Sequence, residues 1–417
     1  MKKLMIVAVM AVFWAGQAFA AVSSAADGSA EQSGLKSLAR KKWTIMVYMS
    51  NRNNLASVTM ANIAELESVG SSENFNVVIE RARVLPKEGE YGPVERLYIQ
   101  KSVPKEKSQS IVLQSRPGAD LGDWKEARDF VDFSKNNFPA EKYLLIIWNH
   151  GSGWASDGKK PIEGTSGKTR GIAFDDVSDN HITTIELAAL LEAAGGVDVF
   201  ASDACFMADI AVNTEIAPYT RYIVASQEMT RNFGYDYARI LNKFDKNPDM
   251  SAEGAAVALV DSFAEFYDWR PYLYSQVGLT MSAIRADVVE PLNRELKKFT
   301  AMAMQSKDSE AVKKAFKKAN VFSTMDAVDL YDFLSILKKN TSDAKLAYEC
   351  EKIMGYVSHR LVVKNLARGR HSGVAHGVSV YMPHEMYNLA YDKLLFTKET
   401  NWYDFTHYLF KLTKKPR

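Results

Sequence analysis

The sequence predicts an α/β fold in which a mostly parallel sheet carries helices on both faces. Short apolar runs rich in branched residues alternate with amphipathic segments along the first half of the chain, and this alternation is typical of parallel sheets. With 417 residues, 47% of them hydrophobic, the chain can bury a large core. Two of the apolar runs, residues 143–148 and 197–201, stop on polar and small residues. Residues that follow parallel strands emerge at one edge of the sheet, where open α/β sheets place their sites.

The strands expected in the first half are rich in branched and aromatic residues. They are residues 43–49, 75–84, 96–101, 110–114, 143–149, 171–175, 197–201 and 222–226. The expected helices have apolar residues at helical spacing, and they are residues 55–69, 123–137, 184–194 and 209–219. Asp123 opens the second of these helices, and Thr183 or Thr184 caps the third. A tight turn or hairpin is expected at residues 176–183 and a loop at residues 227–237.

The second half is richer in helical pattern. Its expected elements are helices at residues 251–269 and 287–304, a strand at 278–284, a helical stretch at 308–361, a strand at 373–382 and an amphipathic ending at 401–412. We therefore expect a catalytic domain at residues 41–246. A helix-rich part at residues 247–417 would return a strand to the sheet.

The first 20 residues have the pattern of a signal peptide. Lys2 and Lys3 precede an apolar segment, and Ala18-Phe19-Ala20 supplies the small residues that signal peptidase accepts. The apolar segment is short for a membrane span, so cleavage after Ala20 is favoured over an uncleaved anchor. Residues 21–40 are small and polar, which predicts a disordered leader. The protein is expected to be secreted or periplasmic, without a stable membrane anchor.

The charge balance argues against a polyanionic partner. The chain has 52 basic and 50 acidic residues, so loss of Lys2 and Lys3 with the signal peptide would leave 50 of each. A formally neutral protein has no general electrostatic preference for nucleic acid or for an anionic membrane. We expect no nucleic acid partner, and we expect a monomer.

The two cysteines could form a disulfide, because an even count is typical of exported proteins. Cys205, however, lies just after a predicted strand, close to Asp203. Cys350 shares one face of an amphipathic helical segment with Ala347 and Met354, and this spacing favours a core thiol. We expect both cysteines to be unbridged.

His150 and Cys205 are the candidate catalytic residues. A thiol at its ordinary pKa is mostly protonated at neutral pH, so a thiol nucleophile needs an imidazole to take its proton and later protonate the leaving amine. His150 fits the base and Cys205 the nucleophile. The amides of Gly151 and Cys205 are the expected oxyanion donors, and Gly151 has no side chain to block the approach. From these residues alone, a turn-capping His150 and a core Cys205 remain the alternative.

Two segments then resemble the His and Cys motifs of the clostripain-like cysteine peptidases. They are NHGSGW at residues 149–154 and DACFM at residues 203–207. Supporting similarity is spread along the chain, in WTIMVYM at 43–49, GIAFDD at 171–176, ASQE at 225–228, GYDY at 234–237 and GVSVYMP at 377–383. The resemblance implies a caspase-like α/β/α sandwich and a secreted cysteine endopeptidase that acts on proteins or peptides.

The resemblance also implies roles for individual residues. His150 and Cys205 carry over as a dyad without a required third member, and Asp203 as an acidic wall of the pocket for the residue before the scissile bond. A preference for Arg or Lys there is implied. Some relatives have a second acidic residue in the following loop, whereas TRNF at residues 230–233 has none.

No cofactor is expected. The other histidines lack paired metal-ligand spacing, and they are His181, His359, His371, His376, His384 and His407. Some relatives respond to calcium, and Asp175, Asp176, Asp179 and Asn180 invite that interpretation, but the run lacks the glycine and terminal carboxylate of an EF-hand loop. A solvated turn is favoured.

Two other classes of function remain as alternatives. One is a caspase-like binding protein that has lost activity. The other is a serine hydrolase that uses Ser152 or Ser202, although neither lies in a nucleophile-elbow sequence.

Residues 151–170 have glycines and basic residues but no apolar periodicity, and so predict a long exposed loop beside His150. If the enzyme prefers Arg or Lys, it could cut itself there. Lys168 is the preferred position, ahead of Arg170 and Lys159, and cleavage would open the site. A surface loop that is merely basic is the alternative.

Overall fold

The computed structural model describes residues 40–103, 107–154, 171–275, 278–323, 326–369, 372–384 and 387–413. The predicted signal peptide and nearly all of the predicted leader lie outside these residues. The candidate self-cleavage positions Lys159, Lys168 and Arg170 also lie outside them. Within the described residues, no helix is both long and apolar enough to cross a membrane.

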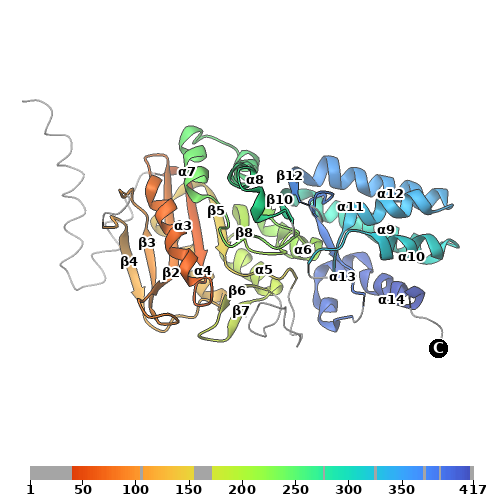
Figure 1. The fold of residues 1–417 in the computed structure, drawn as a ribbon, viewed down its shortest axis with the longest axis horizontal. Helices are drawn as coiled ribbons and strands as arrows, with labels where there is room; N and C mark the ends of the chain where they lie inside the picture. The colour runs from red at the N-terminus through yellow and green to blue at the C-terminus, as the bar shows by residue number, and fades with distance from the viewer. Residues whose placement is uncertain are drawn as a thin grey trace, which may run out of the picture.

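A nine-stranded sheet runs through the molecule in the order β12-β10-β9-β8-β5-β1-β2-β3-β4 (Figure 1). The five strands from β9 to β2 are parallel, whereas the two strands at each edge run antiparallel. The strands are β1 Lys41–Met49, β2 Phe75–Val84, β3 Tyr91–Tyr98, β4 Ile111–Arg116, β5 Ala140–Trp148, β8 Val197–Asp203, β9 Thr220–Ala225, β10 Leu279–Arg285 and β12 Val362–Arg368. The parallel centre confirms the predicted α/β class.

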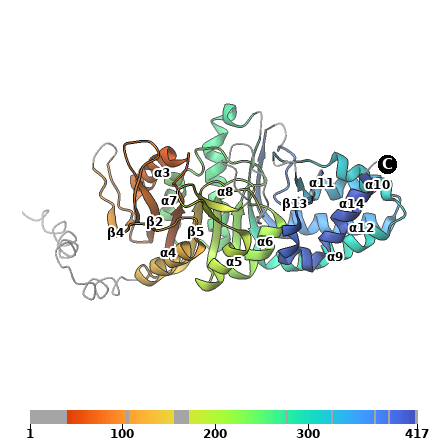
Figure 2. The same ribbon diagram turned by 90° about the horizontal axis from the view of Figure 1, so that it is seen from below.

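Helices cover both faces of the sheet, and Figure 2 shows the two helical layers on either side. One layer contains α3 Ala56–Val69, α7 Tyr237–Lys246 and α8 Ala252–Asp268, and the other contains α4 Trp124–Asn137, α5 Thr184–Ala193 and α6 Ile210–Ile216. Strand β1 serves both, because successive side chains of a strand point to opposite faces. Ile45 and Val47 lie in the core of the first layer, and Met46 and Tyr48 in that of the second. The three-layer sandwich is thus confirmed.

The helix starts follow from their capping residues. Asp123 accepts a hydrogen bond from the Lys125 amide at the start of α4. Thr183, rather than Thr184, caps α5 in a reciprocal capping box with Glu186. Helix α7 and strand β3 differ from the elements expected from the sequence. Helix α7 occupies a region expected to be loop and boundary, and β3 begins at Tyr91 because it forms an antiparallel pair with β2 through Arg81 and Glu95.

The helices of the last third pack together at the end of the molecule opposite β4 (Figure 1). They are α9 Val289–Gln305, α10 Ser309–Lys318, α11 Leu330–Asn340, α12 Ala344–Tyr356, α13 Leu395–Thr400 and α14 Trp402–Thr413. Short 3-10 or π segments join the elements, and they are η2 Ala217–Tyr219, η3 Pro271–Leu273, η4 Ala286–Val288, η5 Val357–Leu361 and η6 Leu389–Lys393.

The strand expected at residues 373–382 is wrong in extent and in partner. Only β13 Ser379–Tyr381 is strand, and it pairs with β11 Ala327–Asp329 in a separate small sheet. The part after residue 246 returns β10 and β12 to the main sheet instead. Strand β12 has a mostly unburied edge sequence, so it lacks the apolar pattern that would have predicted it.

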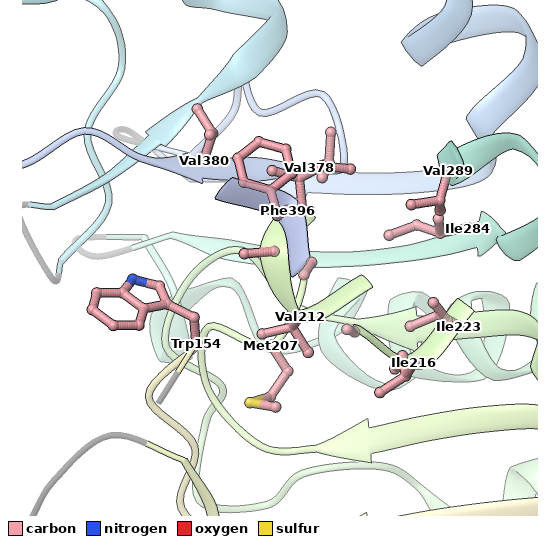
Figure 3. Close-up of a cluster of buried hydrophobic side chains, with 14 of the residues drawn as sticks. Trp154, Met207, Val212, Ile216, Ile223, Ile284, Val289, Val378, Val380 and Phe396 are labelled. Carbon is pink, nitrogen blue, oxygen red and sulfur yellow. The ribbon is translucent and has the colours of Figure 1, made fainter. Parts of the chain in front are cut away.

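One core joins the sheet to the helical part. Figure 3 shows Met207 and Val212, which follow β8, close to Val378 and Phe396 of the last third. Ile223 of β9 lies in the same cluster as Ile284 of β10. The boundary expected between residues 246 and 247 therefore crosses a shared hydrophobic core, and the proposed division into two parts stays a prediction.

Candidate active site

The register of two parallel strands brings the candidate residues together. Trp148 at the end of β5 is paired with Asp203 at the end of β8. His150 and Cys205 each follow two residues later, at the same edge of the sheet. Both line one cavity of about 300 Å³. Gly151 is also in close contact with the Cys205 segment, since a β-carbon on Gly151 would lie 2.5 Å from the Cys205 carbonyl oxygen.

The turn after β8 holds the Cys205 segment on the loop that follows β9. Phe206 has a positive φ of 62°, which few non-glycine residues adopt. Its amide donates to the Glu228 carbonyl at 3.3 Å, and the Ala208 amide donates to the Ser226 carbonyl at 2.9 Å. The Cys205 sulfur lies 3.4 Å from the Thr230 hydroxyl oxygen. The loop from residue 226 to residue 236 therefore forms one side of the cavity.

His150 is held from the other side by Asn54. Its Nε2 lies 2.6 Å from Oδ1 of Asn54, in the turn after β1. An amide oxygen only accepts, so Nε2 carries the proton and Nδ1 has the free lone pair. The sequence places Asn54 between an expected strand at residues 43–49 and an expected helix at residues 55–69, with no sign of a role at the site. Because β1 lies next to β5 in the sheet, the residues that follow β1 can be predicted to lie near His150 once the strand order is known.

Asn149 fixes the backbone that carries His150. Its side chain donates to the Phe174 carbonyl at 3.1 Å and accepts from the Phe174 amide at 2.8 Å. It also donates to the Ser50 carbonyl. These bonds connect the ends of β1 and β5 to β6 Ile172–Asp175, which forms a hairpin with β7 Asn180–Ile182. The expected hairpin at residues 176–183 is thus part of the support for the His150 turn.

Both candidate residues have pKa values that favour their neutral forms. Burial raises the pKa of the Cys205 thiol, an effect that hydrogen bonding to Thr230 partly offsets. Burial lowers the pKa of His150, although the nearby Asp176 acts in the opposite direction. At neutral pH the resting pair is therefore a thiol and a neutral imidazole, not a thiolate and an imidazolium.

Among the described residues, the amides of Gly151 and Cys205 have no hydrogen-bond acceptor. Their neighbours are used, because the Ser152 amide donates to Gly171 at 3.0 Å and the Phe206 amide to Glu228. Within the described part of the chain, no backbone acceptor is bonded to the amide of Gly151 or Cys205. Both amides can thus donate to a group that enters the cavity.

Asp203 is a buried carboxylate in the wall of the cavity. Its Oδ2 accepts from the Tyr235 amide at 3.1 Å and from the Tyr237 hydroxyl at 3.0 Å. Burial raises the pKa of Asp203 to about 6. Gly234 passes so close that a β-carbon there would lie 2.4 Å from the carboxylate. Among the described residues Oδ1 has no hydrogen-bond donor.

The acidic residues that follow β9 have other partners. Glu228 accepts from the amides of Met229 and Ser323. Asp236 caps α7 and pairs with Arg239. Neither acid lines the cavity, whereas Arg231 does. The buried Nε of Arg231 has no hydrogen-bond partner among the described residues.

The alternative serine nucleophiles are buried and engaged. The Ser152 hydroxyl accepts from the Gly171 amide at 2.6 Å, and the Ser202 hydroxyl donates to the Val224 carbonyl at 3.5 Å. Neither lies among the residues that line the cavity. The structure therefore brings His150 together with Cys205 and not with these serines.

Metal ligands do not gather in the described part of the chain, where no group of three or more His, Cys, Asp or Glu side chains could hold an ion. The turn with Asp175 differs from expectation in one respect. Asp176 and Asp179 are exposed, but Asp175 is fully buried and accepts from the amides of Leu121 and Val177, each at 3.0 Å. Its carboxylate thus joins two loops instead of facing solvent.

The two cysteines are unbridged, as predicted. Cys350 is fully buried on α12, in the same hydrophobic core as Leu346 and Ile353. Burial raises the pKa of the Cys350 thiol to about 12. Cys350 is thus a core residue, and Cys205 is the cysteine in the cavity.

The architecture, with the cavity at the carboxyl edge of a parallel sheet in an α/β/α sandwich, is that of the caspase-like folds. A family model described as the clostripain family matches residues 47–409. The chain therefore belongs to the clostripain family of cysteine endopeptidases.

Individual relatives agree with this assignment. Clostripain of Hathewaya histolytica is 27% identical over an alignment of 230 positions, and the match covers 49% of this chain and 42% of that protein. The chain thus spans less than half the length of that relative. Two solved structures share the fold at a TM-score of 0.64. A secreted C11 cysteine protease from Bacteroides thetaiotaomicron with an irreversible peptide inhibitor is 15% identical, and the match covers 88% of this chain and 99% of that one. An inactive zymogen C11 protease from Parabacteroides distasonis is 16% identical, with 87% and 99% covered.

Proposed function

We propose that this protein is an exported endopeptidase that cleaves after Arg or Lys through a Cys205 and His150 dyad. The observation that carries the proposal is the shared cavity, in which a thiol and an imidazole from neighbouring strand ends lie beside two backbone amides that have no acceptor among the described residues. An acyl-transfer reaction needs these three parts, namely a nucleophile, a base and oxyanion donors.

The first chemical step starts from the neutral pair. His150 Nδ1 takes the proton of the Cys205 thiol as the sulfur attacks the scissile carbonyl, and the carbonyl oxygen becomes an oxyanion that accepts from the amides of Gly151 and Cys205. When the intermediate collapses, the imidazolium gives its proton to the leaving amine. Water, deprotonated by His150, then hydrolyses the thioester and releases the acid and the thiol.

Asn54 would act as a positioning residue in this scheme. By accepting from Nε2–H it keeps the imidazole in the tautomer whose Nδ1 can receive the proton, and it stabilises the imidazolium that forms. It takes no part in bond formation or bond breakage in the proposed reaction. Its contribution would therefore appear in the rate of the chemical step.

Selectivity for Arg or Lys would come from Asp203. A basic side chain that reaches Oδ1 would form a charge-assisted hydrogen bond in a buried wall, where such bonds are strong. Arg231 lines the same cavity. It is positively charged, whereas the second residue that some relatives have in this loop is acidic. Its presence weakens the field that attracts a basic side chain, so we expect the preference to rest on Asp203 alone.

The export and self-processing steps belong to the same proposal. The first 20 residues would direct secretion or entry into the periplasm, and cleavage near Lys168 would open the site. The zymogen state in the description of the Parabacteroides distasonis neighbour gives precedent for an inactive precursor in this family.

A direct test is cleavage of dye-linked peptides that differ only in the residue before the bond, with purified wild type and Cys205→Ala. The proposal expects cleavage after Arg and Lys by the wild type only. Equal cleavage after Leu and Arg would contradict the selectivity. A wild type that cleaves none of the peptides would support the inactive binding protein instead. On a denaturing gel, wild type should give two fragments and Cys205→Ala one.

A further inference from the structure

Three large aromatic side chains are unusually exposed in the loop after β9 and in the segment after α8. Trp269 is 84% exposed, Tyr272 74% and Phe233 51%. Trp269 and Tyr272 follow the end of α8, and Phe233 belongs to the loop after β9. Water-exposed rings of this size are costly, and a group of them marks a binding surface more often than single exposed apolar residues do.

The strand directions place these rings at the edge of the sheet where the cavity lies. Strand β9 is parallel to β8, so the loop after Ala225 emerges at the same edge as Cys205. Strand β10 is antiparallel to β9, with Ser282 opposite Ala225, so the segment that precedes Leu279 reaches that edge as well. The loops that carry Phe233 and Tyr272 therefore flank the cavity on the β10 side.

Direct contacts connect the loop after β9 and the end of α8 to the cavity wall. The ring of Phe233 lies 6.1 Å from that of Phe266, near the end of α8. The hydroxyl of Tyr267 donates to the Gly234 carbonyl at 3.3 Å. Gly234 lines the cavity and is in contact with the Asp203 carboxylate. Phe233 and Phe266 are thus continuous with the wall that would hold the residue before the scissile bond, and Trp269 follows Phe266 by three residues at the end of α8.

The guanidinium of Arg270 adds a polar edge to this surface. It stacks on Phe266 at 4.1 Å from the ring centroid, and its Nη1 donates to the Phe266 carbonyl. Stacking of this kind fixes the orientation of the ring. A ring held in place before binding loses little conformational entropy when a ligand packs on it.

We propose that Phe233, Phe266, Trp269 and Tyr272 form an aromatic surface that binds an apolar side chain of the substrate, two to four residues before the scissile bond. The inference rests on the proposed function, because the occupant is the acyl side of the polypeptide that is cleaved. The acyl side is favoured because the surface adjoins Gly234 and Asp203, where the residue immediately before the bond would sit. The site then selects substrates by an apolar residue as well as by a basic one.

The test uses three pairs of dye-linked peptides with Arg immediately before the scissile bond. The two peptides of a pair differ at one position, where one has Phe and the other Gly. The three pairs vary the second, third and fourth residue before the bond. The variant is Trp269→Ser with Tyr272→Ser. The matched control is Tyr348→Ser, since Tyr348 is 68% exposed on α12, away from this edge. For wild type and control, we expect kcat/KM to favour one Phe peptide over its Gly partner by about tenfold, which corresponds to about 1.4 kcal/mol. In the double variant this ratio should fall to about one, mainly through KM.

The outcomes separate the two proposals. If the double variant keeps the wild-type ratio at every position, the aromatic surface is not a substrate site. If light scattering shows that wild type is a dimer and the double variant a monomer with an unchanged ratio, the surface binds a second copy of this chain. If Cys205→Ala cleaves the peptides as the wild type does, the proposed function itself fails.

Discussion

Replacement of Asp203 by Asn tests the origin of selectivity, because it removes the charge and keeps the shape. The structure gives the magnitude. Burial raises the pKa of Asp203 to about 6, and the difference from its ordinary value corresponds to about 3 kcal/mol of cost for the ionised form. A bound cationic side chain would offset this cost, and removal of one partner from a buried charged pair typically costs about 2–5 kcal/mol. We expect kcat/KM for an Arg peptide to fall by about 100-fold to 1000-fold.

The assay compares Arg with citrulline, its neutral isostere, before the scissile bond. In wild type, the ratio of kcat/KM for Arg to that for citrulline should rise with pH through about 6, because Asp203 is neutral below that pH in the free enzyme. In Asp203→Asn the ratio should be low and independent of pH. The reasoning is refuted if the variant loses activity equally on both peptides, or if the wild-type ratio does not change with pH.

A stability measurement serves as the control for folding. The folded-state pKa of Asp203 is raised, so its favourable contribution to folding is complete below the unfolded pKa near 4 and is lost as pH rises through about 6. Asn lacks this ionisation. Asp203→Asn should therefore be no less stable than wild type at pH 8, as measured by urea unfolding.

Three further predictions concern the residues around the dyad. Because burial raises the pKa of the Cys205 thiol, the rate of its alkylation in the free enzyme should keep rising to a higher pH than the rate for free cysteine. A rate that reaches its plateau near neutral pH would contradict this, because it would indicate a preformed thiolate. Asn54→Ala should lower kcat by about tenfold, with little change in KM, and should alter the acidic limb of the pH profile. The control, Asn242→Ala at an exposed position, should change neither kcat nor the pH profile. An unchanged kcat in Asn54→Ala would exclude the positioning role. Gly151→Ala places a β-carbon 2.5 Å from the Cys205 carbonyl oxygen, so kcat/KM should fall by about 100-fold while the protein stays folded by circular dichroism; full activity would show that this approach is not needed.

The central strands could be predicted from the sequence because each is buried on both faces. Strands β1, β5 and β8 are near-continuous apolar runs with turn residues after them, and this pattern is strong in a single sequence. The candidate pair could be predicted for the same reason. His150 and Cys205 follow two such runs directly, so their proximity required only that the two strands be parallel.

The edge strands and the partners of the site depend on tertiary contacts that the sequence does not display. Strand β12 is mostly unburied and pairs with β10 through backbone hydrogen bonds, which any side chain permits. Asn54 and His150 are 96 positions apart in the chain, and Asn54 reaches His150 only because β1 and β5 are neighbours in the sheet. Asp175 was expected in solvent, but its buried carboxylate satisfies two amides that no local pattern identifies.

The most direct test of the account is a double-mutant cycle on the dyad. Cys205→Ala, His150→Ala and the combined variant would be compared by kcat/KM on the Arg peptide, with urea unfolding to verify folding. Because the thiol and the imidazole act in one proton transfer, each single variant should lose nearly all activity and the combined variant should be little worse than either. Losses that add, or a His150→Ala variant that retains substantial activity, would contradict the assignment of the dyad.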